Sequence, residues 1–261
     1  MEGTAVKDGL QIRIGTWNIV GNPIVILVNF ASFIDKKNKI FTEFWEKYKL
    51  DSLSGQWDYT EPVCFGYAAG KVIEHFYKYN LSPRDKVIAH FHEWMTGSGV
   101  LYLKNNVPQI ATVFTTHATV VGRSIAGNGQ PLYRELNNYN ADIKAREFNI
   151  VPKYSCEKIT AQTTDAFTTV SDITNKECKQ FLGKDADYIT PNGFEDNFVP
   201  DVKEFDNKRK AAQDKLKKIT ELVLGYKLSD ETKFIGISGR YEFKNKGIEL
   251  FLETIAEVNK R

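Results

Sequence analysis

The sequence predicts an α/β fold built on a Rossmann-like parallel sheet. Residues 87–91 and 110–115 are short apolar, β-branched and aromatic runs, typical of buried strands, and a helical stretch beginning at Val100 separates them. A strand–helix–strand unit of this kind is the building block of a parallel sheet. The strand–helix pattern returns at residues 234–258, where an apolar run is followed by a loop containing glycine and then by a helical pattern.

Strand-like and helix-like patterns alternate along the rest of the chain. We expect strands at residues 10–14, 24–30, 87–91, 110–115, 166–171, 188–190 and 234–238. Helical spacing of apolar residues predicts helices at residues 33–49, 63–79, 132–148, 154–164, 172–181, 203–224 and 248–258. The apolar run at residues 24–28 is expected to be a buried strand, and the helix at 203–224 to carry an exposed charged face.

Three segments follow from this order. Residues 1–192 are expected to form an N-terminal Rossmann-like domain without an opening strand and glycine-rich loop. Residues 193–231 are a linker with an amphipathic charged helix, and residues 232–261 are the first strand, loop and helix of a second such domain. Since one such unit cannot bury its own apolar faces, we expect a fragment that lacks both ends of the complete protein.

Composition excludes several classes of protein. The 35 basic and 33 acidic residues give a net charge of +2, which argues against a nucleic-acid-binding surface. The three cysteines are widely spaced, form no C-x-x-C pair and suggest a reducing compartment. With no secretory leader and no apolar run long enough to cross a bilayer, we expect a soluble, cytoplasmic protein without a membrane partner.

A first candidate site follows the strand at residues 110–115. Small and polar residues replace the apolar run, and His117 and Arg123 come directly after it. In an open α/β sheet, ligands bind just beyond the carboxyl ends of strands. The alternative to a ligand site is a histidine and an arginine that only make hydrogen bonds within the loop.

A second candidate site lies in the loop at residues 239–247, before the last helix. Arg240 and Lys246 flank this loop, and a helix amino end offers free N–H groups and a positive partial charge. An arginine can hold two phosphate oxygens at once and a lysine adds a mobile charge, so the pair suits a diphosphate. Two ordinary surface cations are the alternative.

His90, His92 and Glu93 raise the alternative of a metal site. The two histidines project to the same side of a strand, but no carboxylate-rich partner motif follows, and catalytic zinc needs three protein ligands. The sequence has no G-x-S-x-G elbow and no phosphate-binding P-loop, which weakens the hydrolase and NTPase alternatives.

Several motifs, taken together, resemble the glycogen synthases of the animal and fungal type, a family also found in some bacteria. They are AHFHEW at 89–94, FTTHATVVGR at 114–123, FTTVS at 167–171, PNG at 191–193 and GRYEFKNKG at 239–247. The resemblance covers nearly the whole chain, and the order and spacing of the motifs make it specific.

The resemblance implies a GT-B glycosyltransferase, with two Rossmann-like domains facing each other across a cleft. The family transfers glucose from UDP-glucose to the 4-hydroxyl at the non-reducing end of glycogen, with retention of configuration and without a metal or cofactor. The family's amino-terminal glycine-rich donor loop is absent from this sequence, and its acidic motif with the essential glutamate would lie beyond Arg261. We therefore expect residues 1–261 alone to show little or no transfer.

The same resemblance implies roles for individual residues. His117 would lie against the donor glucose as the catalytic residue, and Arg123, Arg240 and Lys246 would hold the diphosphate. Asn192 and Glu93 would line the cleft near donor or acceptor hydroxyls. A homo-oligomer of the full-length protein stays open, as does a non-catalytic module of this fold that binds sugar nucleotide or glycan.

Overall fold

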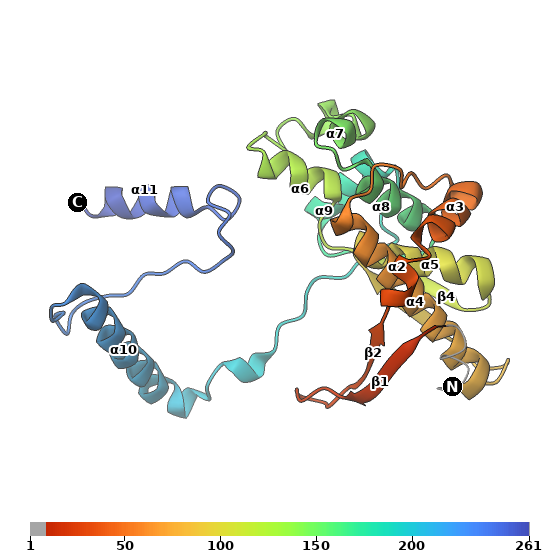
Figure 1. The fold of residues 1–261 in the computed structure, drawn as a ribbon. Helices are drawn as coiled ribbons and strands as arrows, with labels where there is room; N and C mark the ends of the chain where they lie inside the picture. The colour runs from red at the N-terminus through yellow and green to blue at the C-terminus, as the bar shows by residue number, and fades with distance from the viewer. Residues whose placement is uncertain (1–8, 261) are drawn as a thin grey trace. The chain divides into compact units, whose positions relative to one another are not determined.

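The computed structural model describes residues 9–260, and the chain divides into two compact units, Met1–Pro191 and Asn192–Arg261. Figure 1 colours the chain from red at its amino end to blue at its carboxyl end. The described part of the first unit contains, in order, β1 (Gln11–Thr16), β2 (Ile24–Asn29), α2 (Ala31–Ile34), α3 (Lys37–Tyr48), α4 (Trp57–Asn80), β3 (Ile88–His92), α5 (Trp94–Asn106), β4 (Ala111–Thr116), α6 (Val120–Gly127), the 3₁₀ turn η1 (Leu136–Asn138), α7 (Ala141–Glu147), α8 (Val151–Thr163), β5 (Ala166–Thr169), α9 (Asp172–Glu177), the π-helical turn η2 (Cys178–Leu182) and β6 (Tyr188–Ile189).

The first unit is built on a four-stranded parallel sheet in the order β3-β4-β5-β6, which confirms the predicted fold class. Phe91 on β3 pairs with Phe114 on β4, which pairs in turn with Phe167 on β5. All three phenylalanines are buried, so an aromatic row crosses the middle of the sheet and fixes its register.

Helix α5 joins the two apolar cores of this unit. Its residues Val100, Tyr102 and Leu103 pack into the core that contains Phe91, Phe114 and Phe167, while Leu101 packs into a second core between α3, α4 and α8. The helix begins at Trp94, earlier than expected from the sequence. Because it is buried on nearly all sides, its sequence has no amphipathic pattern that would mark where it starts.

Strands β1 and β2 form a separate antiparallel ribbon, visible in red in Figure 1. The expectation of a buried strand at residues 24–28 is wrong in one respect: the strand exists, but Ile24 and Leu27 are 76% and 62% exposed. An apolar run is compatible with burial, but a two-stranded ribbon has too few neighbours to cover both of its faces.

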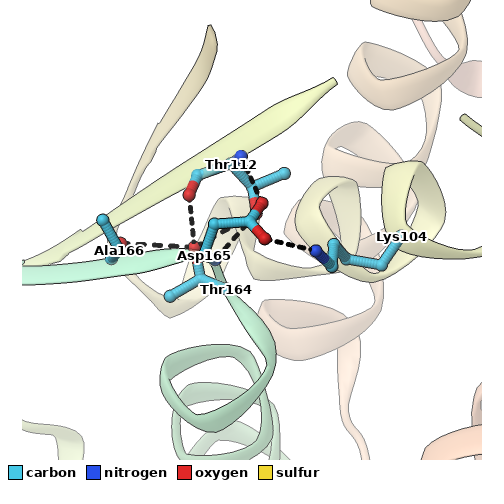
Figure 2. Close-up of polar contacts among 5 residues, drawn as sticks. All are labelled: Lys104, Thr112, Thr164, Asp165 and Ala166. Atoms are coloured by element: carbon cyan, nitrogen blue, oxygen red, sulfur yellow. Dashed lines mark hydrogen bonds and ion pairs between the residues drawn. The ribbon is translucent and has the colours of Figure 1, made fainter. Parts of the chain in front are cut away.

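The amino ends of β4 and β5 are held by one carboxylate, as Figure 2 shows. Asp165 accepts hydrogen bonds from the backbone N–H of Thr112 at 2.7 Å and from its hydroxyl at 2.9 Å, and forms an ion pair with Lys104 at 2.6 Å. Thr164 adds a hydroxyl bond to the Thr112 carbonyl at 3.0 Å. These contacts tie β4, β5 and the end of α5 together at the edge opposite the candidate site.

Three of the predicted helices differ from the expectation. The stretch at 33–49 is divided into α2 and α3. The stretch at 132–148 is not one helix but η1 and α7, because the Asn140 side chain accepts a hydrogen bond from the Ile143 N–H at 3.0 Å and starts a new helix there. The predicted helix at 172–181 ends as α9 at Glu177 and continues as the π-helical η2.

The second unit contains the 3₁₀ turn η3 (Asp196–Phe198), α10 (Val202–Leu224) and α11 (Ile248–Val258). Within residues 192–260, the segment at 234–238 forms no strand, contrary to expectation, and Ile235 and Ile237 are exposed. A strand is stabilised by hydrogen bonds to a neighbouring strand, and this segment has no strand partner in the described chain. No helix among the described residues combines the length and apolarity needed to cross a membrane.

Candidate functional site

The carboxyl edge of the sheet gathers three histidines. His90 and His92 alternate with buried Phe91 on β3, so both imidazoles lie on the exposed face, with ring centroids 4.1 Å apart. His117 follows β4, and its Nε2 atom lies 3.1 Å from Nδ1 of His92. His90 is held by a 2.7 Å hydrogen bond to the hydroxyl of Thr115, so the cluster is anchored to the sheet.

Glu93 links the ends of β3 and β4. Its backbone N–H donates to the Thr115 carbonyl at 2.8 Å, and its carboxylate accepts the backbone N–H of His117 at 3.2 Å. Burial raises the pKa of the Glu93 carboxyl, an effect that the His117 N–H and the charges of Arg123 and His117 offset in part. A half-buried carboxyl with a raised pKa beside an imidazole is the kind of group found at functional sites.

The backbone of Glu93 is itself unusual, with φ 65° and ψ 157°. This region suits glycine almost exclusively, and a non-glycine residue there stores roughly 1–3 kcal/mol of strain. From this position the Glu93 carboxylate accepts the His117 N–H, in the turn that follows β4.

Two buried carboxylates lie beneath that turn, which we define as residues 116–122. Glu157 accepts the hydroxyl of Thr116 at 3.0 Å and the backbone N–H of Val120 at 2.9 Å. Glu177 accepts the hydroxyl of Thr119 at 2.6 Å, and that hydroxyl accepts the Gly122 N–H at 3.0 Å and so caps α6.

Gly122 is required by this packing. A Cβ atom at residue 122 would lie 2.2 Å from Oε2 of Glu177, closer than non-bonded atoms approach. The glycine therefore allows the first turn of α6 to sit directly on the buried carboxylate. Arg123 comes next, with an exposed side chain whose charge acts on Glu93.

The first unit thus brings together three of the predicted site residues, Glu93, His117 and Arg123. The other three, Asn192, Arg240 and Lys246, belong to the second unit and are exposed. Their predicted roles in binding stay predictions.

In the second unit, Arg240 forms an ion pair with Glu242 at 2.9 Å and keeps 63% of its side chain exposed. The loop closes on itself, because the Lys246 N–H donates to the Glu242 carbonyl at 2.9 Å and Gly247 takes a left-handed conformation with φ 68°. Helix α11 begins directly after Gly247, so Lys246 lies next to a helix amino end, where an anion is favoured.

The alternative of a metal centre at His90, His92 and Glu93 finds no support in the geometry. Within residues 9–260, no three or more histidine, cysteine, aspartate or glutamate side chains are grouped as a metal-ligand set. The imidazoles bond to each other and to Thr115 instead.

Sequence reasoning missed Glu157 and Glu177. Both interrupt an otherwise buried helical stripe: Tyr154, Glu157 and Ala161 are spaced by three and four residues on α8, and Thr174, Glu177 and Phe181 have the same spacing on α9 and η2. A glutamate in the apolar stripe of a helix was the available signal, because charged side chains are almost never fully buried without a partner.

Comparison with known proteins supports the resemblance that the motifs carry. A family model described as glycogen synthase matches residues 3–261. The glycogen [starch] synthase of Caenorhabditis elegans is 35% identical over 258 residues, which cover 97% of this chain and 38% of that protein. The corresponding proteins of Dictyostelium discoideum and of Rattus norvegicus liver are 32% and 31% identical, and the matches cover 30% and 36% of their lengths.

The chain therefore spans about a third of the length of these relatives. The matched region includes the sheet, the turn that carries His117 and the loop with Arg240 and Lys246. Since the family model covers nearly every residue, the chain belongs to the glycogen synthase family.

Proposed function

We propose that the protein to which this chain belongs transfers glucose from UDP-glucose to the 4-hydroxyl at the non-reducing end of an α-1,4-glucan. The observation that carries the proposal is the grouping of His117, Glu93 and Arg123 at the carboxyl edge of the sheet in a member of this family. Ligands of open α/β sheets bind at that edge.

The chemistry of the step explains the cations. Breaking the bond between glucose and phosphate leaves negative charge on the departing diphosphate. The family resemblance implies a reaction without a metal, so fixed side chains must stabilise that charge, and preorganised charge often contributes more to catalysis than any other effect. Arg123 from the first unit and Arg240 and Lys246 from the second are the candidates.

In this proposal, exclusion of water from the bound donor limits its hydrolysis. His117 would contact the donor glucose, and Glu93 and Asn192 would line the cleft near sugar hydroxyls.

The test measures incorporation of radiolabelled glucose from UDP-glucose into glycogen. The protein assayed is the full-length gene product. We expect robust transfer, and little or none by residues 1–261 alone. Calorimetric binding of UDP-glucose without any transfer would instead favour a non-catalytic binding module. Absence of both binding and transfer would overturn the proposal.

We further infer a cytoplasmic location and leave a homo-oligomer open to measurement. Cys64, Cys156 and Cys178 are free and buried, which suits a reducing compartment. Fluorescence microscopy of the tagged protein tests the location. Light scattering of the purified gene product tests the oligomeric state.

A further inference from the structure

We propose that Glu157 is a positioning residue for His117, holding with both of its carboxyl oxygens the turn that carries the imidazole. The inference deepens the proposed function and rests on it for the catalytic consequence, but the positioning itself can be tested separately.

The contacts of Glu157 bracket His117 on both sides. Thr116, the last residue of β4, donates its hydroxyl to Oε1 at 3.0 Å, and Val120, the first residue of α6, donates its backbone N–H to Oε2 at 2.9 Å. His117 lies one residue after the first donor and three before the second. One side chain therefore fixes both ends of the short segment from which the imidazole projects.

Glu157 can act in this way because it is itself buried on a core helix. It is 0% exposed on α8, whose neighbours Tyr154, Cys156 and Ala161 are buried in the two cores. Helix α8 packs on β4 and on α6, the two elements that the turn connects. The carboxyl group thus fixes the turn that carries His117 relative to a helix of the core.

Two further carboxylates also hold the turn. The backbone N–H of His117 donates to Glu93 at 3.2 Å, and the Thr119 hydroxyl donates to Glu177 at 2.6 Å. Of the three carboxylates, Glu157 alone contacts the chain both before and after His117 among the hydrogen bonds described. Its loss should therefore displace the imidazole more than loss of a single-sided contact.

A neutral carboxyl matches the two partners of Glu157. Burial raises the pKa of Glu157 to about 8, helped by the nearby carboxylates of Glu93 and Glu177 and opposed by the two hydrogen bonds. In the protonated form, Oε2 accepts the Val120 N–H while the O–H at Oε1 can donate to the oxygen of the Thr116 hydroxyl. A glutamine at residue 157 can make both contacts, since its carbonyl accepts and its amide donates.

This equivalence gives a sharp experiment. The chain has four histidines, His75, His90, His92 and His117, so selective labelling of histidine with ¹³C and ¹⁵N yields only four imidazole spin systems. Variants Glu157→Ala, Glu157→Gln and Thr116→Val are compared in residues 1–261. Glu46→Ala removes an exposed carboxylate on α3 and serves as the control.

We expect Glu157→Ala to shift the ring signals of His117 and of its partner His92, and to leave His75 on α4 unmoved. Glu157→Gln and Glu46→Ala should retain the wild-type His117 signals. A folded Glu157→Ala protein with unchanged His117 signals would overturn the proposal. If Glu157→Ala does not fold, Thr116→Val decides, because it deletes one of the two contacts and leaves Glu157 in place; unchanged His117 signals there also overturn it.

Assays of glucose transfer by the full-length gene product test the catalytic consequence. We expect Glu157→Ala to lower kcat by about 10²-fold, the loss associated with a 1 Å misplacement, with little change in KM for UDP-glucose and with rescue by Glu157→Gln. Failure of the wild-type protein to transfer glucose would remove the proposed function only, and the imidazole signals would still decide the positioning. Equal kcat in wild-type and Glu157→Ala proteins would overturn the catalytic consequence.

Discussion

The Nδ1 atom of His92 and the Nε2 atom of His117 lie 3.1 Å apart, so the ends of β3 and β4 are joined by a hydrogen bond between two imidazoles. One ring must donate and the other accept, so the tautomers of the two neutral rings are coupled. The ring of His90 is tilted by 33° against that of His92, with the centroids 4.1 Å apart, and bonds to Thr115. The orientation of His117 therefore depends on two further histidines.

A pH titration should detect this arrangement. Burial lowers the pKa of His92, and its neighbours His90 and His117 lower it further. The folded protein then binds fewer protons than the unfolded chain just below pH 6.5, so this group removes stability as the pH falls through that window. We expect the ring signal of His92 to titrate below about 6.5. His90→Gln should raise that midpoint, and a wild-type midpoint above 6.5 would contradict the prediction.

Glu157 should give a stability change of opposite sign. Its pKa is raised from 4.5 to about 8, so the folded state retains a proton that the unfolded state releases. Stability from this group is fully present below pH 4.5, declines as the pH rises toward 8 and is level above it. The decline should reach at most about 1.4 kcal/mol per pH unit.

Urea unfolding of the wild type and of Glu157→Gln between pH 5 and pH 9 checks this expectation. The variant has no titrating group at residue 157. Its free energy of unfolding relative to that of the wild type should therefore increase as the pH rises to 8. A constant difference across the range would show that Glu157 does not titrate in this window.

The strained backbone of Glu93 makes a third prediction. Glu93→Ala and Glu93→Gly both lose the carboxylate, but glycine relieves a φ of 65° that alanine retains. After subtracting the greater freedom of glycine in the unfolded chain, we expect the glycine variant to be more stable by about 1 kcal/mol. The same pair at Glu46, in helix α3, should show the reverse order by about 1 kcal/mol. Matching orders at both residues, measured by urea unfolding, would mean that Glu93 is not strained.

The sheet and the outer residues of the site could be predicted because their signals are local. Alternation places His90 and His92 on one face of β3, and a strand that ends in small polar residues marks the position of His117. These features depend on neighbours in the sequence. The strand–helix–strand order then implies a parallel sheet without any knowledge of packing.

The support beneath the turn could not be predicted, because it depends on which helix face meets which loop. Glu157 and Glu177 come 40 and 60 residues after His117, and only the packing of α8 and α9 brings them under it. The exposed apolar residues of β2 and the unpaired segment at 234–238 fail as predictions for a related reason. Burial and pairing belong to neighbouring elements, which a local pattern does not contain.

At the opposite edge of the sheet, Asp165 makes a prediction about stability alone. Burial raises the pKa of Asp165, but the hydrogen bonds from Lys104 and Thr112 outweigh it and the pKa is lowered overall. Asp165→Ala leaves the buried Thr112 N–H without this acceptor and should cost about 1–3 kcal/mol. Lys104→Met removes only a partly exposed ion pair and should cost less, about 1 kcal/mol or below. Urea unfolding measures both, and equal losses would show that the Thr112 contacts contribute little.

The ion pair between Arg240 and Glu242 leads to the last prediction, on the gene product. If Arg240 grips the diphosphate, Arg240→Ala should weaken UDP binding by about 1.5–3 kcal/mol, the range for hydrogen bonds to charged groups. The phosphate must compete with Glu242, whose carboxylate lies 2.9 Å from the guanidinium. Because Arg240 is mostly exposed, that pair is weak, and Glu242→Gln should strengthen UDP binding by at most about 1 kcal/mol, less at high salt. Lys244→Ala, an exposed cation in the same loop, is the control and should change the affinity far less. Calorimetry with UDP separates these outcomes, and equal effects of Arg240→Ala and Lys244→Ala would reduce Arg240 to one of several general surface charges.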